Sequence, residues 1–146
     1  MAAPQLYFED VEVGTEIGPL EKSPTPRQLV RYAGASGDYA EIHYNMEIAQ
    51  SRGFPAPILH GLLKCAFLGQ LMTDWLGEWG ELKSLDTQYR RIDLYNVPFT
   101  CSGRVTAKYV KDGENWVECE VWGENPKDGI TTIGKATATL PTRPKS

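Results

Sequence analysis

The hydrophobic positions of this chain are densest over residues 60–76, which read His-Gly-Leu-Leu-Lys-Cys-Ala-Phe-Leu-Gly-Gln-Leu-Met-Thr-Asp-Trp-Leu. The apolar residues fall on nearly all sides of a helical wheel, which predicts a core helix buried on most sides. Lys64, Gln70 and Asp74 interrupt the apolar run, and a helix of roughly 25 Å with three polar interruptions is a poor membrane span. We therefore expect the rest of the chain to wrap this helix.

Two shorter helices are predicted upstream of it. Thr25 is a suitable N-cap and Pro26 a suitable first helical residue for a helix that Gly34 ends, with one apolar side. After a loop at 35–44, Asn45 caps a second short helix at 46–52, which Gly53 stops.

Downstream of the long helix the apolar period changes from helical to two, which predicts strands. They are placed at 81–93, 99–110, 115–124 and 130–140, and a first strand is expected within 15–22. Lys-Asp-Gly-Glu at 111–114 predicts a tight hairpin turn, so the strands are expected to be antiparallel. On the third of these strands Val117, Cys119 and Val121 alternate with Trp116, Glu118, Glu120 and Trp122. Two tryptophans on the polar face suggest a subunit contact.

Length and charge narrow the function. A chain of 146 residues suits a single domain at 1–146, with 141–146 expected to be a loose tail. A net charge of −4 and a pI near 5.2 argue against nucleic-acid or anionic-membrane partners and favour a small ligand.

Residues 1–5 lack a basic region followed by an apolar run, so we expect no signal peptide and a cytoplasmic, reducing setting. The cysteines are expected to be buried thiols: Cys65, Cys101 and Cys119.

Asp38 and His43 are the candidate chemical groups. On a helix their five-residue spacing would separate them by about 140°, and in an extended chain by roughly 16 Å. Only a bent loop brings both to one atom, and Gly34 and Gly37 allow such a bend. A carboxylate and an imidazole that converge on one water form a general acid–base pair. The alternative is that Asp38 caps the next segment and His43 satisfies a backbone carbonyl.

The entry to the long helix is the second candidate feature. Two prolines, Pro55 and Pro57, force an extended approach and place Gly61 in the first turn, where backbone N–H groups lack intrahelical partners. Such a helix start is suited to bind a developing negative charge.

Residues 32–49, joined to the Pro-Ile-Leu-His-Gly stretch at 57–61 and the long helix, resemble the MaoC-like hydratase/dehydratase family of the hot-dog fold. The shared signature is Ser-Gly-Asp, a histidine five residues after the aspartate, and a later His-Gly that opens the central helix. The matching residues are Ser36, Gly37, Asp38, Ile42, His43, Ala49, His60 and Gly61. The resemblance implies an α+β fold in which a curved antiparallel sheet of about five strands wraps one central helix.

The resemblance also implies an activity. The chain is expected to be a hydro-lyase of fatty acid metabolism that adds or removes water across the double bond of a 2-enoyl-CoA, with a 3-hydroxyacyl product of R configuration. Asp38 and His43 would hold the water, and the Gly61 N–H would stabilise the thioester oxygen. The site-supporting residues would be Ser36, Gly37, Tyr39 and His60, with a structural role favoured for His60. Coenzyme A enters as part of the substrate, so no separate cofactor and no metal are expected.

The chain departs from the family pattern Asp-x-Asn-Pro-x-His, because Ala40 and Glu41 replace the asparagine and the proline. The aspartate and histidine of the acid–base pair are both present, and the two replacements bear on the rate, the substrate or the activity itself. Either Tyr39 or Asn45 takes over the function of the family's asparagine side chain, or Asn45 is only an N-cap and Tyr39 only a packing residue. Arg90 and Arg91 either meet coenzyme A phosphates or form a solvated face.

Alternative functions and the assembly complete the expectations. The alternatives are a non-catalytic or half-catalytic hot-dog subunit of a hetero-oligomeric dehydratase and an acyl-CoA thioesterase. Open sheet edges and surplus tryptophans predict a homodimer. Those tryptophans are Trp75, Trp79, Trp116 and Trp122.

Overall fold

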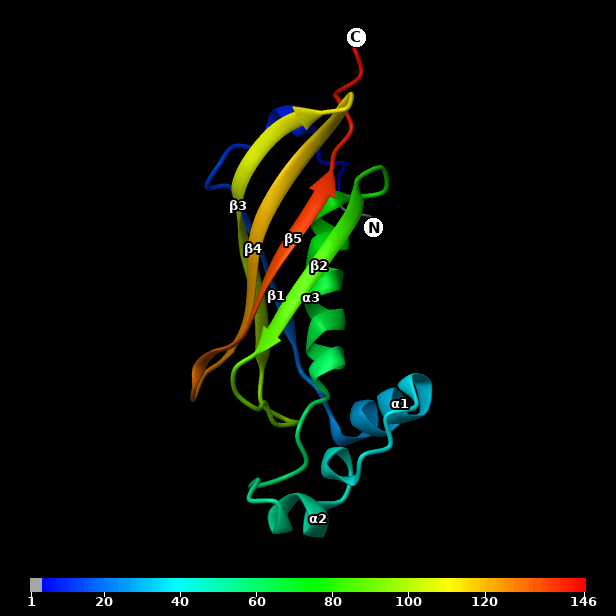
Figure 1. Cartoon of the computed structure of the whole chain (residues 1–146), viewed down its shortest axis with the longest axis vertical. Helices are drawn as coiled ribbons and strands as arrows, with labels where there is room; N and C mark the ends of the chain where they lie inside the picture. Colours follow the sequence, from blue (N-terminus) through cyan, green and yellow to red (C-terminus); the bar gives the residue numbers. More distant parts are fainter. Residues whose placement is uncertain (1–3) are drawn as a thin grey trace.

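Five antiparallel strands form one curved sheet around a single long helix in the computed structural model, which describes residues 4–146 (Figure 1). In chain order the elements are η1 (Phe8–Asp10), β1 (Glu16–Lys22), α1 (Pro26–Ser36), η2 (Glu41–His43), α2 (Met46–Ser51), α3 (Gly61–Leu76), β2 (Glu81–Tyr89), β3 (Phe99–Lys111), β4 (Glu114–Asn125) and β5 (Gly129–Thr139). The strand order is β1-β3-β4-β5-β2, so β1 and β2 are the edges. The predicted hot-dog architecture is confirmed. Residues 1–3, part of the predicted domain and of the N-terminal segment in which no signal peptide is expected, lie outside the described residues.

The core lies between α3 and one face of the sheet. Buried side chains of α3 such as Phe67, Leu68 and Met72 pack against the alternating Val117, Cys119 and Val121 of β4. Full burial of one such side chain contributes about 1.5–3 kcal/mol, so this layer stabilises the position of α3 more than its helix propensity does.

The expectation that α3 is buried on most sides is wrong for one face. Leu62 is 61% exposed and Ala66 is also exposed, whereas Lys64 is 2% exposed. The sheet covers one side of the helix, and α1 and α2 gather near its N-terminal end rather than along it (Figure 1). Lys64 is buried together with its ionic partner Asp93, which lies 29 residues further along the chain.

Helix α1 begins as predicted, with Thr25 accepting a hydrogen bond from Gln28 N–H and Pro26 as the first residue. It does not end at Gly34. The helix continues to Ser36, and Gly37 terminates it with a left-handed φ of 77° and an N–H donated to the Ala33 carbonyl. Helix α2 has the predicted Asn45 cap, whose side chain accepts from Ile48 N–H at 3.2 Å.

The strands match the predicted segments except at the end of β2. The hairpin at 111–114 turns through Asp112 and Gly113, both at positive φ. Strand β2 ends at Tyr89 instead of continuing to 93, because the N–H groups of Arg90 and Arg91 both donate to the Thr131 carbonyl. Residues 90–95 therefore leave the sheet and pass beside 58–59, where Ile58 and Leu94 form an isolated bridge.

Two expectations about cysteines and the chain end need correction. All three cysteines are free; Cys101 and Cys119 are buried, but Cys65 is only partly so. Residues 141–143 are held rather than loose, since the Pro141 carbonyl accepts from Phe8 N–H and the Arg143 N–H donates to Glu9. Among residues 4–146, no helix combines the length and apolar character needed to span a membrane.

Candidate active site

The turn after α1 fixes the Asp38 carboxylate. Asp38 N–H donates to Ser36 Oγ at 3.1 Å, and Asp38 Oδ1 accepts from Ala40 N–H at 3.2 Å. This local turn is the one that the left-handed Gly37 makes possible. One carboxylate oxygen is thus engaged by the backbone, and the other, Oδ2, faces His43.

His43 lies at the end of η2 and is 7% exposed. Its Nδ1 is 2.8 Å from the Ile58 carbonyl oxygen. Because a carbonyl oxygen only accepts, Nδ1 carries the ring proton, and Nε2 of the neutral imidazole is an acceptor. Nε2 lies 3.6 Å from Asp38 Oδ2. The bent loop brings the predicted pair together, and the carbonyl bond offered as the alternative role of His43 is also present; the two are compatible.

The imidazole ring of His60 stacks on the ring of His43. The two imidazoles stack with centroids 3.8 Å apart and planes 20° apart, and Tyr32 packs edge-on against His60 at 4.8 Å. His60 Nε2 is 3.3 Å from the Asp38 carbonyl, while Nδ1 has no hydrogen-bond partner among the described residues. Burial, followed by the neighbouring His43, lowers the pKa of His60 below its ordinary value. His60 is therefore neutral at pH 7 and packs rather than carries charge.

Gly61 opens α3 directly after His60. The His60 carbonyl accepts from the N–H groups of Leu63 and Lys64. The Gly61 N–H belongs to the first turn, where no intrahelical acceptor is available. The ring of Tyr89 lies over Gly61, and a Cβ at this position would come within 2.8 Å of Tyr89 Cε2. Glycine is needed here for the close approach of the Tyr89 ring, a feature that the sequence alone did not reveal because β2 is far from Gly61 in the chain.

The loop keeps its shape without the family's asparagine and proline. The Ala40 carbonyl accepts from His43 N–H at 3.1 Å, and the Glu41 carbonyl accepts from Tyr44 and Asn45 N–H. Asn45 caps α2, which occupies its amide oxygen, and the Tyr39 side chain is 61% exposed. Tyr39 contributes its backbone carbonyl, which accepts from the Tyr44 hydroxyl at 2.9 Å.

Asp38, His43 and His60 each bring one potential ligand atom within 4.8 Å of the others, a spacing at which a metal ion could be considered. Imidazoles ligate through lone pairs in the ring plane. The two rings are stacked nearly parallel with centroids 3.8 Å apart, so their in-plane lone pairs lie in two separate planes and are poorly placed to converge on one ion. The arrangement suits hydrogen bonding to a small molecule better than metal ligation.

A small cavity of about 120 Å³ adjoins His43. It is lined by Pro26, Val30, His43, Tyr44, Met46, Pro57 and Tyr95. Val30, Tyr44 and Met46 are between 42% and 58% exposed, an unusual set of large apolar side chains for a water-facing surface.

Arg90 and Arg91 are exposed on the connection from β2 to β3, and Arg90 donates to Gln88.

A curved five-stranded sheet around one helix, with a carboxylate and an imidazole at the helix entrance, is the arrangement expected of a MaoC-like hot-dog domain. The family described as MaoC like domain matches residues 10–102, and the chain belongs to this family.

Curated relatives match over part of the chain. The "3-hydroxybutyryl-CoA dehydratase" of Methylorubrum extorquens is 37% identical over 68 residues, which is 46% of this chain and 42% of the relative. The "(R)-specific enoyl-CoA hydratase" of Rhodospirillum rubrum is 32% identical over 66 residues, 45% of each. The matches thus span less than half the length of these relatives.

Solved structures match over nearly the whole chain. The R-hydratase PhaJ1 of Pseudomonas aeruginosa aligns with a TM-score of 0.85 and 21% identity, covering 95% of this chain and 88% of that one. A chain of the ChsH1-ChsH2 complex of Mycobacterium tuberculosis aligns with a TM-score of 0.79 and 24% identity, covering 88% and 98%. At these identities the likeness establishes the fold.

Proposed function

We propose that this protein catalyses the reversible addition of water across the double bond of a 2-enoyl-CoA thioester. The observation that carries the proposal is the pair of acceptors, Asp38 Oδ2 and His43 Nε2, held 3.6 Å apart beside the start of α3. Two acceptors at this separation are suited to receive both hydrogens of one water. A water held by both hydrogens presents its oxygen lone pair to an electrophile.

In the proposed reaction the water oxygen forms a bond to C3 of the enoyl group. The C2–C3 π electrons move toward the thioester carbonyl, whose oxygen becomes negatively charged. One proton of the water passes to the Asp38–His43 pair, and the pair delivers a proton to C2, so the site returns to its starting protonation state. General acid–base groups of this kind typically contribute about 10²–10⁴-fold.

The developing oxyanion needs a donor, and the Gly61 N–H at the positive end of α3 is suited to supply it. Loss of one such donor in other enzymes typically costs about 10²–10³-fold. The R configuration of the 3-hydroxyacyl product is proposed by analogy with the relative named as an (R)-specific enoyl-CoA hydratase.

The apolar surface beside His43 supports a second proposal, that the site is completed by a second hot-dog chain. Val30, Tyr44 and Met46 line the small cavity and remain partly exposed in the single chain. Cover by a second subunit would enclose the acyl group. One solved neighbour is described as a complex of two chains, which supports considering a partner as well as a homodimer.

Turnover of crotonyl-CoA by the purified chain tests the proposal. Loss of the enoyl thioester absorbance would measure hydration, and chiral chromatography of the hydrolysed product would give its configuration. The proposal expects turnover and an R product. A folded chain without turnover would refute it for the chain alone, and activity restored by a second hot-dog chain would favour the partner-subunit function.

A further inference from the structure

A buried ion pair lies one helical turn beyond Gly61, among residues to which no chemical step has been given. Lys64 Nζ is 3.0 Å from Asp93 Oδ2, and the two residues are 2% and 3% exposed. Removing two charges from water is costly, and the cost is recovered only where further hydrogen bonds satisfy both groups. The partners of the pair therefore indicate what it holds in place.

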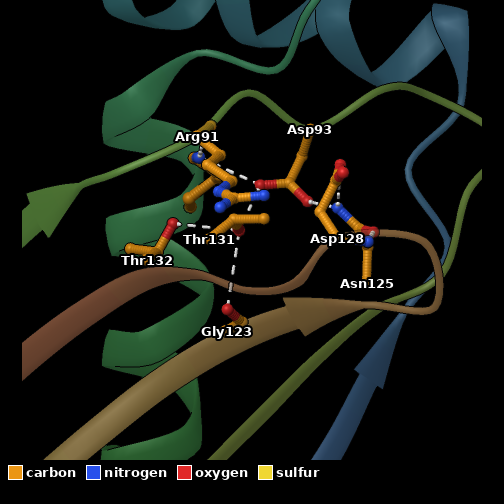
Figure 2. Close-up of polar contacts among 8 residues, drawn as sticks. Arg91, Asp93, Gly123, Asn125, Asp128, Thr131 and Thr132 are labelled. Atoms are coloured by element: carbon orange, nitrogen blue, oxygen red, sulfur yellow. Dashed lines mark hydrogen bonds and ion pairs between the residues drawn. The ribbon is translucent and has the colours of Figure 1, made fainter.

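The partners come from three separate parts of the fold. Thr131 Oγ1 donates to Asp93 Oδ2 at 2.6 Å, and Asn125 Nδ2 donates to Asp93 Oδ1 at 2.8 Å. Lys64 Nζ donates a second bond to the Arg91 carbonyl at 2.9 Å. Figure 2 shows the Asp93 carboxylate between Thr131 and Asn125. The network joins α3, segment 90–95 and the ends of β4 and β5.

The main chain at Asp93 extends this network to the catalytic pair. The Asp93 carbonyl accepts from Leu59 N–H at 2.9 Å, and Leu94 bridges to Ile58. The Ile58 carbonyl is the acceptor for His43 Nδ1, and Ile58 N–H donates to the Ile42 carbonyl at 3.0 Å. Asp93 is thus connected to the His43 ring through the backbone of residues 58–59, which is hydrogen-bonded to both.

We propose that Lys64 and Asp93 are positioning residues for His43. By fixing segment 90–95 they fix the Ile58 carbonyl, which holds the His43 ring in the tautomer protonated at Nδ1 and leaves Nε2 free toward Asp38. Without the pair, segment 58–59 loses its support and His43 samples both tautomers. The expected effect on turnover rests on the proposed hydration, whereas the effect on the tautomer does not.

The test combines a double variant with a matched control. Lys64→Met together with Asp93→Asn removes both charges at similar volume and leaves neither charge unpaired. Leu76→Ala, at the opposite end of α3, also removes a buried group but lies far along the helix from the site. A milder variant, Thr131→Val, deletes one donor to Asp93 and serves where the double variant does not fold.

Ring 15N correlation spectra on tag-free protein give a direct readout, since the chain contains two histidines and His60→Gln assigns them. We expect the wild type and Leu76→Ala to show His43 protonated at Nδ1. The double variant should show mixed tautomers and a kcat lower by about tenfold or more, with KM changed by less than about threefold. Thr131→Val should shift both readouts in the same direction by a smaller amount.

Unchanged His43 tautomers in a folded double variant, or in Thr131→Val if the double variant does not fold, would overturn the proposal. A shared loss of kcat in Leu76→Ala would also overturn it, because the effect would then follow stability alone. If the wild type does not hydrate crotonyl-CoA, the tautomer measurement still decides the positioning role.

Discussion

The two histidines carry the same ring, but their surroundings separate their roles. His43 donates from Nδ1 to a carbonyl and leaves Nε2 toward Asp38, whereas His60 is 1% exposed with Nδ1 unpartnered among the described residues. The five-residue spacing of Asp38 and His43 left their pairing open, and the resemblance to the family motif favoured it. The stacking of the two imidazoles could not be foreseen from spacing, because it depends on how segment 57–60 returns beside η2.

The lowered pKa of His60 makes stability depend on pH. Unfolded His60 takes up a proton near its ordinary pKa of 6.5, whereas the folded ring resists protonation until lower pH. The unfolded state therefore binds more protons in this window, and the free energy of unfolding should fall as the pH drops below about 6.5. Urea unfolding of the wild type and His60→Gln at pH 7, 6 and 5 measures this. An equal pH dependence in both proteins would contradict the assignment.

Gly61 gives a second prediction at a single residue. Gly61→Ala should lower kcat/KM and destabilise the fold by about 1–3 kcal/mol, because the new Cβ overlaps the Tyr89 ring. Adding Tyr89→Ala removes the overlap and should recover part of the kcat/KM that Gly61→Ala loses. Steady-state kinetics and thermal melting of the two single variants and the double variant measure the coupling. Strictly additive effects would show that the contact does not matter.

At the scale of elements, the sequence predicted the helices and strands because apolar residues recur with the helical period in the helices and with a period of two in the strands. The α3 segment, the hairpin at 111–114 and the alternation along β4 were all predicted and are confirmed. The end of α1 was misplaced because Gly34 and Gly37 are both plausible terminators, and only Gly37 adopts a positive φ. The predicted end of β2 was misplaced because the N–H groups of Arg90 and Arg91 both donate to the carbonyl of Thr131, which lies more than thirty residues away in the sequence.

The loop between α1 and α2 predicts the effect of restoring the family proline. Ala40 has φ −57° and ψ 124°, the extended region that a residue before proline favours. Glu41→Pro should therefore stabilise the fold by about 0.4–1 kcal/mol through the unfolded chain. Thermal melting checks this, and a loss of stability would contradict the described backbone at 40–41.

Adding Ala40→Asn to Glu41→Pro tests whether the departure from the family pattern matters for catalysis. If the departure is a defect, the double variant should hydrate crotonyl-CoA faster than the wild type. If it is an adaptation to a bulkier acyl group, crotonyl-CoA turnover should rise while turnover of the native substrate falls. Rates unchanged on both short and bulky enoyl-CoA substrates would mean that positions 40 and 41 are neutral.

For the whole molecule, the sheet has two open edges, β1 and β2, and Trp79 is 59% exposed. Open strands present unpaired N–H and C=O groups and invite another strand. The composition pointed to such a contact, but it could not reveal the Lys64–Asp93 pair, whose members are 29 residues apart and meet only when α3 and segment 90–95 pack. Long-range polar pairing is the part of this site that sequence periodicity does not encode.

The open edges predict a homodimer that buries more than about 1,000 Å² in total. Multi-angle light scattering at micromolar concentration should give a mass of twice the 16.3 kDa chain. A mass near 16.3 kDa would remove the homodimer, and a mixed species formed on adding a second hot-dog chain would support the partner-subunit function.

The most direct measurement of the central claim is the rate of crotonyl-CoA hydration in Asp38→Asn and His43→Gln, each compared with the wild type at matched folded fraction. Both substitutions keep the side-chain size while removing the acid–base function. The account predicts that each lowers kcat by about 10²-fold or more, with melting temperatures close to the wild type. Either variant retaining most of its hydration rate with normal melting would contradict the assignment of Asp38 and His43 as the acid–base pair.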